Sequence, residues 1–167
     1  MDELLAAWQR ERPELDTAPL AVLSRVSRLA RHLDRARRAV FAEHGLEAFE
    51  FDVLAALRRA GPPYELSPGR LLRETLVGSG TMTNRLDRLE AGGLVRRRPD
   101  PEDGRGVRVR LTTCGRARVD AAVAGLVERE RALLAGLPDR ERERLAALLR
   151  DVLLRFERAP DTDVNGG

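Results

Sequence analysis

The sequence contains no lysine, a single cysteine, two histidines and few aromatic side chains. Its 30 basic residues other than histidine are therefore all arginine. This bias is typical of a GC-rich coding sequence, so arginine content alone does not indicate phosphate binding. Aromatic residues make up only 4% of the chain, against 43% hydrophobic residues. A core of Leu, Val and Ala suits packed helices better than a β-sandwich, whose strands are enriched in aromatic and β-branched residues.

The scarcity of cysteine and histidine excludes several kinds of site. Cys114 has no second cysteine to pair with, so no intramolecular disulfide can form, and a reducing cytoplasm is the expected compartment. Two separated histidines, His32 and His44, do not complete a metal-ligand set with one cysteine. The sequence also shows no nucleophile–base constellation and no phosphate-cradling glycine loop. We therefore expect neither an enzyme nor a bound metal or cofactor.

Long apolar runs are absent as well, and the charged N-terminal stretch MDELLAAWQRERPELD has no apolar core. We expect a soluble protein that is neither exported nor inserted in a membrane. The length of 167 residues fits one domain with a substantial core. The formal charge of +3 is small, but arginines are concentrated in residues 96–118 while acidic residues are spread over the other segments.

Apolar spacing and chain-breaking residues predict mostly helices. A long helix over residues 19–42 has an apolar seam with alternating steps of four and three, formed by Val22, Val26, Leu29, Leu33, Ala36 and Val40. Further helices are predicted over residues 2–10, 49–61, 66–76 and 81–93, and from residue 114 to Phe156 with a break at 137–139. Two short strands, 94–100 and 107–113, flank the loop between them, and in the second Val107, Val109 and Leu111 should face inward.

The order helix, helix, helix, strand, strand is that of a winged helix-turn-helix, which we assign to residues 46–113. Residues 18–43 and 114–158 carry apolar seams that such a module does not need, so we predict that they form a homodimer interface. Residues 1–12 form an additional N-terminal helix, and the polar tail 159–167 is expected to be disordered. The predicted fold class is mainly α with a small β wing.

The second helix of the helix-turn-helix begins SGTMTNRLDRLE and is the expected DNA-reading element. Met82, Leu86 and Leu89 recur at helical spacing and should anchor it to the core. The other face carries hydroxyl, amide and guanidinium groups, which can hydrogen-bond to base edges and phosphates. These groups belong to Ser79, Thr81, Thr83, Asn84, Arg85 and Arg88. A solvated amphipathic helix would show a similar pattern. The arginine-rich hairpin that follows favours DNA binding.

That hairpin, RRRPDPEDGRGVRVRL, places Arg105 between two glycines at its tip. There Arg105 could enter a minor groove, where A·T-rich DNA concentrates negative potential. Asp103 lies two residues earlier and could position the guanidinium through a local ion pair. Because an exposed ion pair contributes only about 0–1 kcal/mol of stability, we expect this pair to orient Arg105 rather than to stabilise the fold.

The pattern D-x-R-x5-L-T, formed here by Asp103, Arg105, Leu111 and Thr112, resembles the wing signature of the MarR family of bacterial transcriptional regulators. The stretch SGTMTNRLDRLEAGGLVRR is similar to that family's recognition helix and first wing strand, and the resemblance covers about residues 20–155. It implies a winged-helix homodimer that binds pseudo-palindromic operator DNA, usually as a repressor. A small anionic or phenolic ligand typically releases such a regulator.

A narrower resemblance concerns the urate-responsive subgroup of the family. That subgroup carries a Trp on an extra N-terminal helix, an Asp and an Arg seven apart before the reading module, and an Arg on the recognition helix. Trp8, Asp52, Arg59 and Arg85 match these types at similar spacing, which implies a site for a flat anion. From the spacing alone, a Trp that packs a helix and a structural ion pair are the favoured interpretation; the family resemblance shifts it toward ligand binding.

Other readings of the function also remain open. A tricarboxylate such as citrate or aconitate could be the effector, pH could act through His32 or His44, and oxidation could act through Cys114. In a different class, a winged-helix protein–protein adaptor would not bind DNA at all. Whether a DNA-binding protein of this kind represses or activates transcription does not follow from the sequence.

Overall fold

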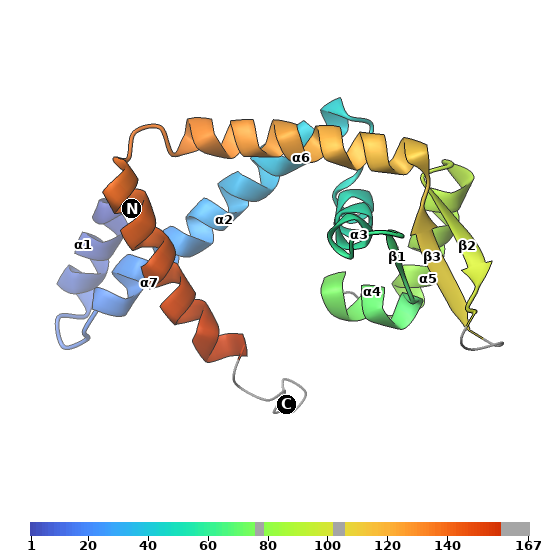
Figure 1. Ribbon diagram of the computed structural model, residues 1–167. Coiled ribbons are helices and arrows are strands. Elements are labelled where there is room, and N and C mark those ends of the chain that lie inside the picture. Colours follow the sequence, from blue (N-terminus) through green and yellow to red (C-terminus); the bar gives the residue numbers. More distant parts are fainter. Residues whose placement is uncertain (76–78, 102–105, 158–167) are drawn as a thin grey trace. The chain divides into compact units, whose positions relative to one another are not determined.

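The computed structural model describes residues 1–75, 79–101 and 106–157 (Figure 1). Asp103, Arg105 and the tail 159–167 lie outside these ranges. In chain order the elements are α1 Asp2–Glu11, α2 Ala18–Glu43, α3 Ala48–Arg59, β1 Glu65–Leu66, α4 Pro68–Thr75, α5 Ser79–Ala91, β2 Val95–Pro99, β3 Val107–Leu111, α6 Thr113–Leu133 and α7 Asp139–Glu157. The mainly helical fold with a small β wing is confirmed.

The chain divides into two compact units, the first comprising Met1–Leu126 and the second beginning at Val127. The core of the first unit lies between α3, α4, α5, the sheet and the first turns of α6. Five consecutive residues of α3, from Val53 to Leu57, are buried, which makes this helix the centre of the core. Met82, Leu86 and Leu89 of α5 are 2%, 2% and 0% exposed, so they anchor that helix as its spacing predicts.

Helix boundaries in the first unit follow from local capping. The Ser67 hydroxyl accepts a hydrogen bond from the Arg70 amide at 3.3 Å, and Pro68 occupies the first helical position of α4. The N-terminus of α3 has a capping box between Glu47 and Glu50. Gly45, just after the C-terminus of α2, adopts a φ of 64°, a left-handed conformation that lets the chain leave the helix at low energetic cost.

The three strands form an antiparallel sheet in the order β1-β3-β2. Val109 and Leu111 point into the core, with 0% and 6% exposure. Val107 is 39% exposed, so the expectation that it packs inward was wrong. It pairs with Pro99 at the end of the hairpin away from α6, beyond the reach of the core. Asp100 closes this end by donating its amide to the Gly106 carbonyl at 2.9 Å.

The junction between the wing and α6 is held by Thr112. Its hydroxyl donates to the Gly93 carbonyl at 2.7 Å and accepts from the Gly115 amide at 2.9 Å. One side chain thus caps the start of α6 and ties it to the turn between α5 and β2. Gly115 itself is buried. The β3–α6 connection is therefore short and closely packed against the turn between α5 and β2.

Much of the apolar surface is left uncovered in the single chain. In α2, Val22, Val26 and Leu29 are 58%, 40% and 51% exposed, whereas Val40 at the other end of the predicted seam is buried. In the second unit, Leu148, Leu153 and Phe156 of α7 are 56%, 56% and 73% exposed. Among the described residues, no helix is both long and apolar enough to cross a bilayer.

Candidate nucleic-acid interface

Helix α5 presents polar side chains opposite its buried face. Thr81, Thr83, Asn84 and Arg88 are exposed, and Arg85 is half-buried. The side chain of Ser79 falls outside the described part of the chain. Hydroxyl and amide groups of this kind hydrogen-bond base edges, and guanidiniums bind guanine or phosphate. The exposed face of α5 thus has the chemistry of a DNA-reading surface.

Both arginines of this face rest on one aromatic ring from α3. The guanidiniums of Arg85 and Arg88 each lie 4.9 Å from the centroid of the Phe49 ring, within the range of a cation–π contact. Arg88 also forms an ion pair with Glu47 at 2.5 Å. The hydrogen bond to Glu47 raises the pKa of Arg88 above its ordinary value. The N-terminal end of α3 therefore fixes the direction of two side chains on α5.

Arg97 braces the wing against α5. Its Nη1 donates to Glu90 at 2.9 Å, its amide donates to the same carboxylate at 2.8 Å, and its Nη2 lies 2.7 Å from Asp87. Unlike its neighbours in the RRR run, Arg97 is on the face of β2 that meets α5. In the sequence these arginines form one charged run, and this role of Arg97 was not predicted from it. The only sequence signal for this role is strand alternation, which puts Arg97 on the opposite face of β2 from the exposed Arg96.

Asp52 lies in a field of arginines from three helices. Burial raises the pKa of Asp52 above its ordinary value, and the positive charges of Arg85, Arg59 and Arg37 act in the opposite direction. The residue is still exposed at the surface, so the loss of solvent around its carboxylate is partial. The structure thus brings Asp52, Arg59 and Arg85 within electrostatic reach of one another, and adds Arg37 of α2, which sequence reasoning did not select.

Phe49 also belongs to this neighbourhood, because it carries Arg85 and shares a helical face with Asp52 and Arg59. Its spacing of three residues from Asp52 and ten from Arg59 on α3 is a signal in the sequence, although Phe49 was not among the predicted site residues. We call Phe49, Asp52, Arg59 and Arg85, with Arg37, the α3–α5 cluster. It combines an aromatic face, one carboxylate and three guanidiniums.

Trp8 lies apart from this cluster within one chain. It is 48% exposed on α1, and α1 is tied to α2 by an ion pair between Asp2 and Arg25. Arg37 follows Arg25 by about three helical turns, roughly 18 Å along α2. Among the described residues, no hydrogen bond, ion pair or ring contact joins Trp8 to Asp52, Arg59 or Arg85. The structure gathers three of the four residues expected to bind an effector and leaves the fourth elsewhere.

The other candidate sensing residues lie at separate places. His32 is exposed on α2, 3.3 Å from an Arg35 nitrogen. His44 follows the end of α2 and approaches Gly125 of α6. Cys114 is exposed in the first turn of α6. Within the described ranges, no group of three or more His, Cys, Asp or Glu side chains is placed to hold a metal ion.

Comparisons with known proteins agree with this arrangement. A model of the MarR family matches residues 44–106. The HTH-type transcriptional regulator PecS of Dickeya dadantii is 41% identical over 134 residues, which cover 80% of this chain and 81% of PecS. The HTH-type transcriptional repressor NicR of Pseudomonas putida is 35% identical over 113 residues, covering 65% of this chain and 70% of NicR.

Solved structures show the same fold. A mutant of Escherichia coli MarR complexed with operator DNA matches with a TM-score of 0.68 and 28% identity, covering 87% of this chain and 97% of that one. Sco5413, a MarR family transcriptional regulator from Streptomyces coelicolor, matches with a TM-score of 0.71 and 25% identity over 85% of this chain and 97% of its own. The chain therefore belongs to the MarR family of DNA-binding transcriptional regulators.

Proposed function

We propose that the protein is a homodimeric repressor that binds pseudo-palindromic operator DNA and is released by a small anion such as urate. The observation that carries the proposal is the α3–α5 cluster, because it joins a candidate anion site directly to Arg85 of the DNA-reading helix. The similarity to PecS extends over most of the chain. NicR, another relative, is described as a repressor.

In this proposal α5 enters the major groove, with Thr81, Thr83 and Asn84 at base edges. Arg85 and Arg88 contact bases or phosphates beside them. Ser79 at the start of α5 would take part, as would Asp103 and Arg105 in a flanking minor groove. In a symmetric dimer the two half-sites are centred about one helical turn, ~10 bp, apart.

The homodimer is supported by the exposed apolar side chains at both ends of the chain. Val22, Val26 and Leu29 of α2 form one row in the first unit, and Leu148, Leu153 and Phe156 belong to the second. Monomeric soluble proteins rarely leave so many large apolar side chains in water. A second copy would cover them and would present two α5 helices to the DNA.

We expect the protein to bind the intergenic DNA beside its own gene, with affinity that falls steeply as salt rises. Each phosphate neutralised by arginine releases condensed counterions, so the logarithm of the binding constant should decrease linearly with the logarithm of salt concentration. Fluorescence anisotropy of a labelled intergenic fragment at several NaCl concentrations measures this slope. Absent or salt-independent binding would favour the protein–protein adaptor instead.

Release by an anion follows from the position of Arg85. An anion bound beside Asp52 would attract the guanidiniums of Arg59 and Arg85, and drawing Arg85 from the Phe49 ring would reorient it on α5. The same anion would repel the Asp52 carboxylate and raise its pKa further. Because protonation of Asp52 removes this repulsion, anion binding should become tighter as the pH falls toward the pKa of Asp52.

Urate is expected to weaken operator binding by the native protein. Arg59→Ala should raise the urate concentration required by about tenfold or more, since a charged hydrogen bond contributes roughly 1.5–3 kcal/mol. Asp52→Asn keeps an acceptor oxygen but removes the charge, so it should reduce the pH dependence of the response. Anisotropy titrations of the preformed operator complex with urate, at two pH values, measure both effects.

Arg38→Ala is the matched control, because Arg38 is exposed on α2 and forms an ion pair with Asp34, four residues before it. Its urate response should equal that of the native protein.

Trp8→Phe tests whether Trp8 reaches the site from the second chain of the dimer, and an unchanged response would remove Trp8 from the site. If urate has no effect while citrate or aconitate dissociates the complex, the effector assignment is wrong but repression by this fold is not. A response to pH or oxidant alone would direct attention to His32, His44 or Cys114.

A further inference from the structure

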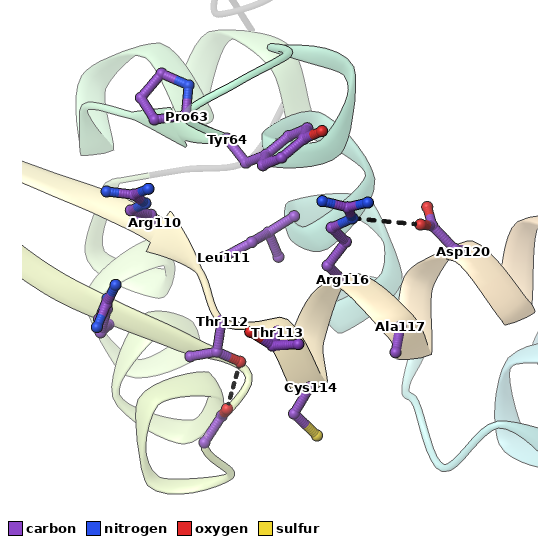
Figure 2. A pocket seen from close by; sticks show the side chains of 12 residues that line it. Pro63, Tyr64, Arg110, Leu111, Thr112, Thr113, Cys114, Arg116, Ala117 and Asp120 are labelled. Atoms are coloured by element: carbon purple, nitrogen blue, oxygen red, sulfur yellow. Dashed lines mark hydrogen bonds and ion pairs between the residues drawn. The ribbon is translucent and has the colours of Figure 1, made fainter.

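An arginine-lined cavity lies at the base of the wing, where β3 continues into α6. It has a volume of about 830 Å³ and lies between the Pro63–Tyr64 turn, the two wing strands and the first turns of α6. Figure 2 shows Arg110 on the strand side, Arg116 on the helix side and the Tyr64 ring on a third side. Arg96 of β2 also lines the cavity.

Within the described part of the chain, the charge on the strand side of the cavity is not balanced by an ion pair. Arg96 and Arg110 are directly opposite one another in the β2–β3 ladder, an arrangement that destabilises a sheet. Neither forms a hydrogen bond or ion pair with the described residues. The next pair on the same face, Arg98 and Arg108, differs because Asp100 binds Arg108 at 2.6 Å. Among the described residues of the wing, an acid pairs with the Arg98–Arg108 pair but none pairs with Arg96 or Arg110.

The helix side adds a third arginine with a weak partner. Asp120 accepts a hydrogen bond from Arg58 at 2.7 Å and lies 3.9 Å from Arg116. Arg116 lies over the Tyr64 ring, 5.1 Å from its centroid. Glu65 of β1 is opposite Arg110 in register, but the described chain contains no ion pair between them. Three guanidiniums line the cavity, and the one carboxylate lining it, Asp120, is already engaged by Arg58.

The cavity faces away from the DNA-reading helix. Side chains alternate between the two faces of a strand, and Arg97 of β2 is directed to Glu90 and Asp87 of α5. Arg96 and its partner Arg110 are therefore on the opposite face of the sheet from α5. An operator contacted by α5 would not fill this cavity, so a small ligand is the better-fitting occupant.

We propose that this cavity binds a small phosphorylated anion that carries at least two negative charges. Arginine is suited to phosphate because its planar fork can donate two parallel hydrogen bonds. The volume lies within the range of small-molecule sites. The first amides of α6, at Thr113 and Cys114, have no acceptor within the helix and could donate to the same anion. The site is separate from the α3–α5 cluster and does not rest on the proposed response to urate.

Calorimetric titration of the full-length protein with sodium pyrophosphate, at constant ionic strength, tests the proposal. Binding of one pyrophosphate per chain is expected. The double substitution Arg96→Gln with Arg110→Gln should weaken it by about tenfold or more, and Arg116→Gln should do so independently. Far-UV circular dichroism and the melting temperature establish that each variant is folded.

Two matched controls locate the site. Arg98→Gln removes the same charge from the same face of β2 one pair further along, and Arg85→Gln removes an arginine of the DNA-reading face. Both should bind pyrophosphate within about twofold of the native protein. No binding to the native protein would overturn the proposal, as would equal weakening by either control. If the double variant loses operator affinity while pyrophosphate does not bind, DNA phosphate is the occupant and the proposal is wrong.

Discussion

Replacement of Gly115 by alanine is expected to lower the free energy of unfolding by about 3 kcal/mol or more, because the added methyl group has no space. A Cβ at this position would lie 2.0 Å from the carbonyl oxygen of Leu94 and 2.9 Å from its carbonyl carbon. These are backbone atoms of the turn before β2, so they cannot rotate away as a side chain would. Relief would require separating α6 from that turn and breaking the hydrogen bonds of Thr112.

Urea denaturation followed by circular dichroism measures this loss, and the midpoint should shift without a change in slope. Gly136→Ala is the matched control, since a Cβ there meets no atom within 4 Å and the φ of Gly136 is outside the left-handed region. We expect the control to lie within about 0.5 kcal/mol of the native protein, or slightly above it through reduced chain entropy. Equal stability of Gly115→Ala would mean that the wing and α6 are less tightly joined than the contact distances imply.

The fold was predictable from the sequence where a single helix or hairpin contains the whole pattern. The spacing of Met82, Leu86 and Leu89 identified the buried face of α5, and all three are buried. The prediction that Val107 packs inward was wrong. It continues the alternation of Val109 and Leu111, but it is 39% exposed because the core does not extend to that end of the hairpin. Alternation predicts which face a side chain is on, not how far the opposing layer reaches.

The candidate site was predictable only in part, for a similar reason. Asp52 and Arg59 are on one helix, so their spacing alone placed them together, and the family resemblance added Arg85. Phe49 and Arg97 were missed because their contacts are made across elements, to α5 in both cases. Their partners depend on how α5 packs against α3 and β2, which residue spacing within one segment does not specify.

Trp8 differs from these residues, because its place in the effector site stays a prediction. Its residue type matches the resemblance, yet within one chain α1 is tied to α2 by the Asp2–Arg25 ion pair, far along α2 from Arg37. A sequence motif predicts which residue types are present, whereas the packing of the chain determines which of those residues are in contact. Only the second chain of a dimer, or a different arrangement of α1, would bring Trp8 to Asp52.

Asn84→Ala is expected to weaken operator binding by roughly 5- to 150-fold, the loss associated with 1–3 kcal/mol for one bidentate base contact. Asn84 is exposed on α5, and its side chain forms no hydrogen bond with the described residues. Its removal should therefore cost the free protein little stability, and an affinity loss would report the DNA contact. An asparagine side chain can read adenine with two hydrogen bonds, so the loss should be specific to operator DNA.

Parallel anisotropy titrations with the operator and with a scrambled duplex of equal length distinguish this base contact from a phosphate contact. Asn84→Ala should lower operator affinity and leave the scrambled duplex unchanged. An arginine that contacts phosphate behaves differently, so Arg88→Ala should weaken both duplexes and reduce the salt slope by about one. Arg88→Ala also releases Glu47, which lies 2.5 Å from Arg88 in the free protein, so its melting temperature is measured alongside. Equal loss on both duplexes for Asn84→Ala would show that α5 does not read bases through this residue, and the register of α5 in the major groove would have to be revised.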